Sequence, residues 1–169
     1  MFPIERTPEW RRQQQAQIHS AAWQRLTAFL VRFGGERVGC IPGELTTNQI
    51  NYFLARAQRF PFQHITPIPG PELECHANAY RYWQAHQDTT RLVFGMFLCQ
   101  EAWWDCWQLH SWVWIPASQT IGCSWPAQLA EDLMQRRYVG IFITSDGDVE
   151  GVGLHEDWTT KNARLHKGD

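Results

Sequence analysis

Two residues, Cys75 and His110, are of the types that nucleophilic catalysis needs. Cys75 falls at the predicted start of a helix, where free backbone N–H groups and the helix dipole favour the thiolate form of a cysteine. His110 falls near the start of a predicted strand, which could pack against that helix and bring the imidazole to the thiol. The pair would supply a nucleophile and a base that later protonates a leaving group. The N–H groups at the helix start would serve as an oxyanion hole.

The same residue types allow two other interpretations. A free cysteine is often a small buried hydrophobic residue, and a histidine at a strand end is often only hydrogen-bonded. A zinc site is a second alternative, because cysteine and histidine are zinc ligands, but the spacing of these residues matches no zinc finger or His-Glu-x-x-His helix. We therefore expect no metal and no cofactor. The residues weighed for zinc are Cys75, His76, Cys106, His110 and Cys123; Cys99, Cys106 and Cys123 are interpreted as core thiols.

Composition narrows the class of protein. The chain has 169 residues, 44% of them hydrophobic and 19% charged, which is enough to bury a core and argues against long disorder. A net charge of -2 argues against a generic nucleic-acid partner. No apolar run approaches the ~20 residues of a membrane span, and no secretory signal is evident. The five cysteines include no Cys-x-x-Cys spacing, so we expect reduced thiols and a cytoplasmic location, without a membrane partner.

The elements that must position Cys75 and His110 follow from periodicity and punctuation. Thr7 as N-cap, Pro8 in the first turn and Gly34 after the last apolar residue predict one long helix over residues 7–34. A second helix is expected after Thr46 or Thr47, and a proline-rich connector over residues 61–71 is interpreted as an ordered loop.

The remaining chain predicts a hairpin-rich sheet after a third helix. The order of helices followed by antiparallel strands indicates an α+β fold. At the end of the chain, the sequence predicts a turn at residues 146–148 and then a polar tail. The expected elements are a helix over 75–86, strands over 91–99, 108–115 and 120–124, a helix over 126–136 and a strand over 138–144.

Four short motifs occur in an order that resembles a known pattern: Cys75-His76-Ala77-Asn78-Ala79, Val93-Phe94-Gly95-Met96-Phe97, His110-Ser111-Trp112-Val113 and Tyr138-Val139-Gly140-Ile141. The pattern is that of a family of poorly characterised bacterial and phage proteins, which is similar to the papain-like and transglutaminase-like cysteine enzymes. The resemblance covers roughly residues 72–143. It implies a helix that carries the nucleophile Cys75 and packs on a mostly antiparallel sheet that carries the base His110.

The chain departs from this pattern at one position. The family has an Asp on the return strand, where it orients the histidine, and Gly122 stands there instead. Three explanations stay open: the site works as a dyad, another residue substitutes, or the domain binds without catalysing. The candidate substitutes are Asn78, Gln119 and Ser124. Papain-like enzymes also use a Gln upstream of the Cys as an oxyanion donor, a role that the resemblance offers to Gln63.

Ten tryptophans are the compositional outlier, and many lie near His110. Trp112 and Trp114 share one face of the predicted strand, either in the core or, with Trp104, lining a substrate cleft. Residues 103–107 are expected in the connection between two strands, where Trp103, Trp104 and Trp107 could form a lid or a partner surface.

The sequence thus predicts a helical extension or cap over residues 1–60, a papain-like core over 61–150 and a tail over 151–169. The expected function is that of a thiol hydrolase or acyltransferase that acts on a peptide, a protein or a small-molecule amide through Cys75 and His110. A non-catalytic binding protein on the same scaffold, phage- or defence-related or a subunit of a complex, is the alternative. A biosynthetic enzyme for a small molecule is a third class.

Overall fold

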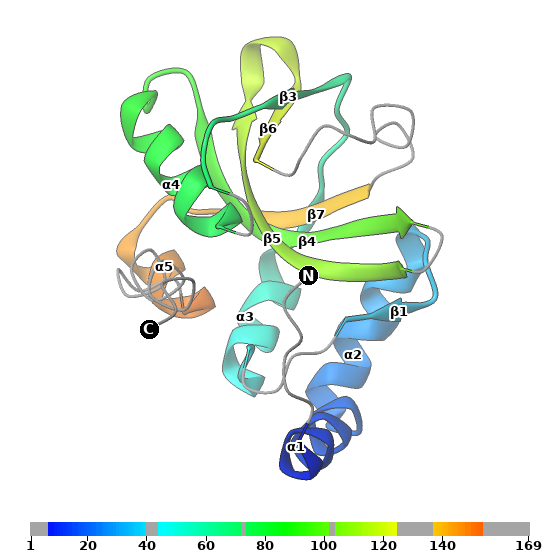
Figure 1. Ribbon diagram of the computed structural model, residues 1–169. Coiled ribbons are helices and arrows are strands. Elements are labelled where there is room, and N and C mark those ends of the chain that lie inside the picture. The colour runs from blue at the N-terminus through cyan, green and yellow to red at the C-terminus, as the bar shows by residue number, and fades with distance from the viewer. Residues whose placement is uncertain (1–6, 40–43, 72–73, 102–103, 125–136, 154–169) are drawn as a thin grey trace.

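The computed structural model describes residues 7–39, 44–71, 74–101, 104–124 and 137–153 (Figure 1). The described residues form α-helices and one open, mixed sheet, so the fold is α+β. The elements in chain order are α1 (Pro8–Ile18), α2 (Ala21–Leu30), the short 3-10 helix η1 (Val31–Phe33), β1 (Arg37–Val38), α3 (Thr47–Arg56), β2 (Gln58–Arg59), β3 (His64–Pro67), α4 (Cys75–Ala85), β4 (Arg91–Glu101), β5 (Trp104–Ile115), η2 (Pro116–Ser118), β6 (Thr120–Cys123), β7 (Arg137–Phe142) and α5 (Asp146–Val152).

The sheet is built around the long hairpin of β4 and β5. Its strand order is β2-β7-β4-β5-β6-β3, and β1 pairs with β5 off this path. The strands β2, β7, β4, β5 and β6 pair antiparallel with their neighbours, whereas β1 and β3 pair in parallel with β5 and β6. The shorter hairpin from β5 to β6 sets the register that matters for the site, because it places Val113 opposite Gly122.

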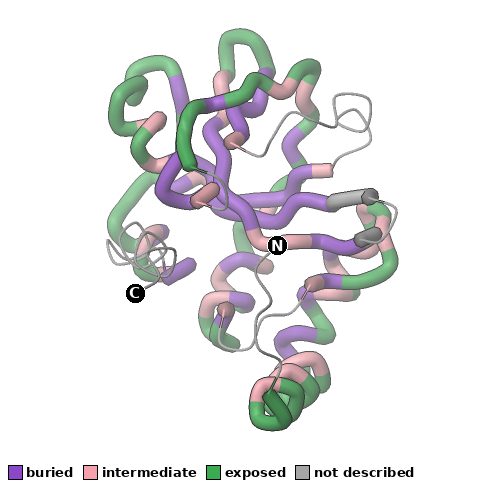
Figure 2. Tube along the Cα trace, in the orientation of Figure 1, coloured by how far each residue is buried: buried purple, intermediate pink, exposed green. Residues whose placement is uncertain are grey.

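Residues of opposite parity in β5 serve two separate cores, as expected for a strand with both faces covered. Trp107 and Val113 join the larger core with residues of α2, α3, α4 and α5. Trp112 belongs to the smaller core on the other face, where Phe60 and Phe62 pack against it. The buried residues run along the central strands in Figure 2.

The predicted helix over 7–34 is wrong as a single element. The chain leaves the helical path after Ile18, and Ser20 caps a new helix by accepting a hydrogen bond from the Trp23 backbone N–H at 3.3 Å. A serine side chain that bonds to a nearby backbone N–H competes with continuation of the preceding helix, which explains the break. The helix α1 contains no buried residue, whereas α2 buries Leu26 and Leu30 completely.

The first sixty residues share the core of the sheet. The helices α2 and α3 contribute Leu30 and Phe53 to the larger core, β1 extends the edge of β5, and β2 pairs with β7. The segment that the sequence assigns to an extension or cap therefore helps to bury the helix-covered face of the sheet.

Several other elements differ from the expectation. The strands β2 and β3 flank or lie in the proline-rich connector, where short runs paired to distant strands leave little periodicity. Residues 146–148 begin α5 instead of forming only a turn, because Ser145 and Asp148 make a capping box. Residues 104–107 belong to β5, not to a connection. The helix expected over 126–136 lies outside the described residues.

Candidate active site

Cys75 is the first residue of α4, as the sequence predicted. The side chain is only partly exposed, and burial raises the pKa of its thiol to about 12. The backbone N–H groups of Ser111 and His76 lower this pKa, whereas a negative charge on Cys123 or on Glu44 raises it. The helix start therefore acts in the expected direction, but desolvation outweighs it. The expectation of a depressed thiol pKa is wrong for this environment, and the resting group is a neutral thiol.

His110 forms a buried pair with Cys123. Its Nε2 lies 3.0 Å from the Cys123 Sγ, and the two residues are 1% and 2% exposed. The imidazole also packs against Phe97 and Trp112, with ring centroids 4.8 and 6.2 Å away. Cys123, interpreted from the sequence as a core thiol, is thus both buried and hydrogen-bonded to the candidate base.

Cys75 lies next to this pair. The pairing of β5 with β6 ends at Val113 and Gly122, and the start of α4 meets β5 just beyond, at the backbone of Ser111. His110 is the next residue along β5. Cys123, the last residue of β6, acts electrostatically on Cys75 and is bonded to His110. The structure therefore places Cys75 near Cys123 and beside the backbone of Ser111, the residue after His110, where α4, β5 and β6 meet.

His76 fastens α4 to β5. Its Nδ1 lies 2.6 Å from the Ser111 Oγ, and its ring stacks on Phe94 with centroids 5.8 Å apart. The side chain is 7% exposed, and burial lowers its pKa to about 4, so the ring is neutral at pH 7. The sequence assigned no role to this contact. Its one signal is the position of His76 in the first turn of α4, directly after Cys75.

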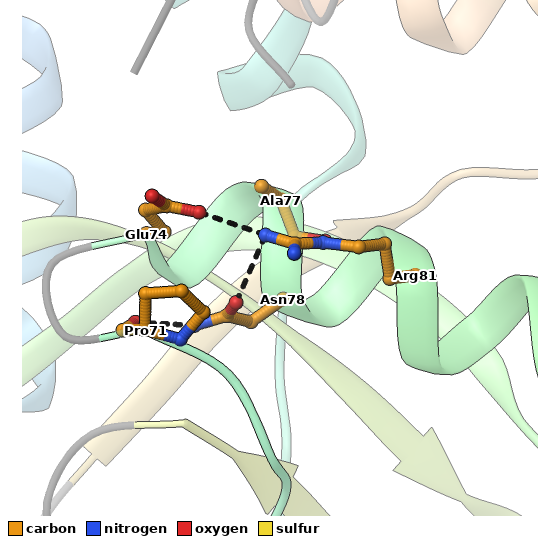
Figure 3. Close-up of polar contacts among 5 residues, drawn as sticks. All are labelled: Pro71, Glu74, Ala77, Asn78 and Arg81. Carbon is orange, nitrogen blue, oxygen red and sulfur yellow. Dashed lines mark hydrogen bonds and ion pairs between the residues drawn. The ribbon is translucent and has the colours of Figure 1, made fainter. Parts of the chain in front are cut away.

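Asn78 and Arg81 bond the first turns of α4 to Pro71 and Glu74, two residues that precede Cys75 (Figure 3). The Asn78 Nδ2 donates to the Pro71 carbonyl at 2.8 Å, and the Arg81 guanidinium donates to the Asn78 Oδ1 at 3.2 Å and to the Glu74 carboxylate at 2.8 Å. A Cβ at Gly70 would overlap the Asn78 amide, so glycine permits this close approach. Asn78 thus contacts the loop before Cys75 and supports the position of the thiol.

Gly122 lies on the wrong face of β6 to serve His110. A Cβ there would meet Val113 and Ile68, which belong to the helix-covered core, whereas Cys123 shares the other face with Trp112. Gln119, another residue that could orient His110, is exposed and accepts a hydrogen bond from the Gln63 side chain.

Gln63 lies at the far end of β6 from the site. Its Nε2 donates to the Gln119 Oε1 at 3.2 Å, and its backbone N–H donates to the Gln119 carbonyl. Gln119 precedes Thr120, whereas Cys123 ends the strand, so the two residues are about 13 Å apart along an extended chain. The structure does not bring Gln63 to Cys75.

The tryptophans divide between core and surface. Trp112 is fully buried against Phe60 and Tyr138, so it belongs to the core and lines no cleft. Trp114 is partly exposed on the same face. Trp107 is also fully buried, with its Nε1 donating to the Gly34 carbonyl at 2.8 Å, which removes it from the proposed lid. Trp103 and the side chain of Trp104 lie outside the description.

Comparison with known proteins gives no relative: no family model, no curated protein and no solved structure matches the chain. The resemblance to papain-like enzymes stays a prediction. Within the described residues, no group of three or more His, Cys, Asp or Glu side chains is arranged to hold a metal ion. Among the helices in the described part of the chain, none is long and apolar enough to cross a membrane.

Proposed function

We propose that the protein is a thiol hydrolase or acyltransferase of papain-like type in which Cys75 attacks an amide or ester carbonyl and His110 moves the proton. The observation that carries this proposal is the position of Cys75. The partly exposed thiol of Cys75 lies at the start of α4, beside the backbone of Ser111 in β5, which is the residue after His110.

The raised pKa of Cys75 determines how the chemistry would proceed. A thiol with a pKa of about 12 supplies almost no thiolate at pH 7, so the proton must leave as the sulfur attacks. The Cys75 proton passes to His110 while Sγ bonds to the carbonyl carbon, and N–H groups at the start of α4 donate to the oxyanion.

The second half of the reaction restores the site. The carbonyl carbon–nitrogen bond breaks as His110 returns its proton to the leaving amine, which leaves a thioester on Cys75. Water or a second amine then attacks the thioester, giving its proton to His110, and Cys75 departs as the thiol. Hydrolysis and transamidation differ only in this second nucleophile.

Trapping of the acyl-enzyme tests the proposal. Incubation with p-nitrophenyl acetate should release a burst of one equivalent of nitrophenol and add one acetyl group to Cys75, as located by mass spectrometry of the digested protein. Cys75→Ser should keep the fold and lose the burst, and His110→Ala should slow acylation at least about a hundredfold. Acetylation spread over several thiols, or a burst that survives in Cys75→Ser, would exclude Cys75 as the nucleophile.

A non-catalytic binding module is the second candidate. The observation that favours it is the environment of Cys75, where burial disfavours the thiolate and Gly122 supplies no carboxylate. This candidate expects Cys75→Ala to leave partner binding unchanged. Because Trp107 is a core residue, its substitution would lower stability and is unsuited to mapping a partner surface.

A further inference from the structure

The sequence has no Asp at the position expected to orient His110, but in the structure His110 forms a hydrogen bond with Cys123. Gly122 has no side chain to orient a histidine, and its Cβ direction points to Val113 on the opposite face. The next residue, Cys123, faces His110 and lies 3.0 Å from its Nε2. We propose that Cys123 is a positioning residue that holds His110 in the orientation and tautomer needed to take the proton from Cys75.

The geometry of the imidazole supports this role. A neutral histidine carries its proton on one ring nitrogen and accepts at the other. When the Nε2–H donates to the Cys123 Sγ, Nδ1 is the basic nitrogen, and the proposed function then assigns the Cys75 proton to it. The surrounding rings of Phe97 and Trp112 limit rotation of the imidazole, so the thiol contact selects among few orientations.

The electrostatic consequence differs from that of a carboxylate. A sulfur atom is a weak hydrogen-bond acceptor and, as a neutral thiol, adds no negative charge beside the imidazolium. Cys123 would therefore hold the orientation of the ring, and the Nε2–H tautomer when its Sγ accepts, but would stabilise the charged ring less than an Asp does. Replacing it should weaken proton transfer by the value of one buried hydrogen bond, about three- to tenfold in rate, and not abolish it.

This inference rests on the proposed function, so the experiment separates the two. The rate of Cys75 alkylation by iodoacetamide is measured against pH in the native protein, His110→Ala, Cys123→Ala and Cys123→Ser. Cys106→Ala is the matched control, because Cys106 is also 2% exposed but lies on β5 away from the His110 contact. The 15N shifts of the His110 ring report its tautomer in the same samples.

We expect Cys123→Ala to lower the rate at pH 7 about three- to tenfold and to alter the His110 tautomer, while Cys123→Ser retains both and Cys106→Ala changes neither. In the native protein His110 should carry its neutral proton on Nε2. A proton on Nδ1 would overturn the inference even if Cys123→Ala fails to fold. So would Cys75 alkylation that depends on His110 but not on Cys123, or His110-dependent alkylation of Cys123 itself. Alkylation of Cys75 that ignores His110, with the Nε2–H tautomer present, would reject the proposed function but leave Cys123 as the residue that holds the ring.

Discussion

Adding a single methyl group at Gly122 should destabilise the fold. A Cβ at this position would lie 2.5 Å from the Val113 Cγ2 and 3.0 Å from the Ile68 Cγ2. Both neighbours are buried, and both are β-branched and stiff at χ1, so neither can turn aside without moving its own surroundings. Overpacking of this kind costs about 1–3 kcal/mol. Gly122→Asp should cost more, because it also places a carboxylate in the apolar face that α4 covers.

Urea unfolding monitored by tryptophan fluorescence measures the effect. For Gly122→Ala we expect a lower midpoint at an unchanged slope, with a fall in melting temperature of roughly 2–4 °C per kcal/mol. Gly147→Ala is the matched control, since Gly147 is exposed on α5 and its nearest neighbour, the Ser145 Oγ, is 3.6 Å from the added atom. The control should be neutral or more stable by up to about 1 kcal/mol.

The result also bears on the face that Gly122 occupies. If Gly122→Ala were as stable as the native protein, the packing against Val113 would be wrong. If Gly122→Asp were well folded and raised the reactivity of Cys75, the side chain would reach His110. Either outcome would refute the assignment of Gly122 to the helix-covered face and of Cys123 to the His110 face.

Three further predictions concern the fold. Burial keeps the folded pKa of His76 near 4, below its ordinary 6.5, so the unfolded chain binds a proton first as the pH falls. The free energy of unfolding should therefore fall by up to about 3 kcal/mol between pH 6.5 and pH 4, and in urea titrations His76→Leu should remove this pH dependence. Burial acts to raise the pKa of Asp148, but hydrogen bonds from Tyr52 and from the backbone and hydroxyl groups before α5 outweigh burial and lower this pKa. The contribution of Asp148 to stability is therefore present above about pH 4 and is lost as the pH falls. Asp148→Asn should lower the free energy of unfolding by about 2–3 kcal/mol at pH 7, and a loss that persists undiminished at pH 2 would contradict this. Trp107→Phe removes the hydrogen bond to Gly34 and leaves a gap in the core, which should cost about 1–3 kcal/mol in thermal unfolding; an unchanged melting temperature would show that Trp107 is not packed as described.

The sequence predicted the elements that carry the site because their local signals agree with the fold. The apolar runs of β4, β5 and β7 and the helix that starts at Cys75 lie within a few residues of their expected bounds. The break between α1 and α2 was missed because a capping serine at position 20 interrupts an otherwise continuous helical pattern. The strands β1, β2 and β3 were missed because each is short and is defined by pairing with a distant strand.

The sequence named Cys75 and His110 as site residues, but it interpreted Cys123 as a core thiol and included Gln63, which lies at the other end of β6. A four-residue turn over residues 116–119 sets Ile115 opposite Thr120, which puts Trp112 opposite Cys123 and both on the face of His110. That register could have been read from the hairpin before the structure was known. The raised pKa of Cys75 could not, because the depth of a side chain depends on how α4 packs against β5, which no local pattern specifies.

The pH dependence of Cys75 alkylation, compared between the native protein and His110→Ala, tests the proposed active site most directly. An isolated thiol with a pKa of about 12 would react tenfold faster for each unit of pH up to pH 10 and beyond, with or without the imidazole. If His110 takes the proton, the alkylation rate of the native protein should level off below pH 9. At pH 7 the rate in His110→Ala should then be lower than in the native protein by at least about a hundredfold. A tenfold rise per unit in both proteins would contradict the account and identify Cys75 as a structural thiol.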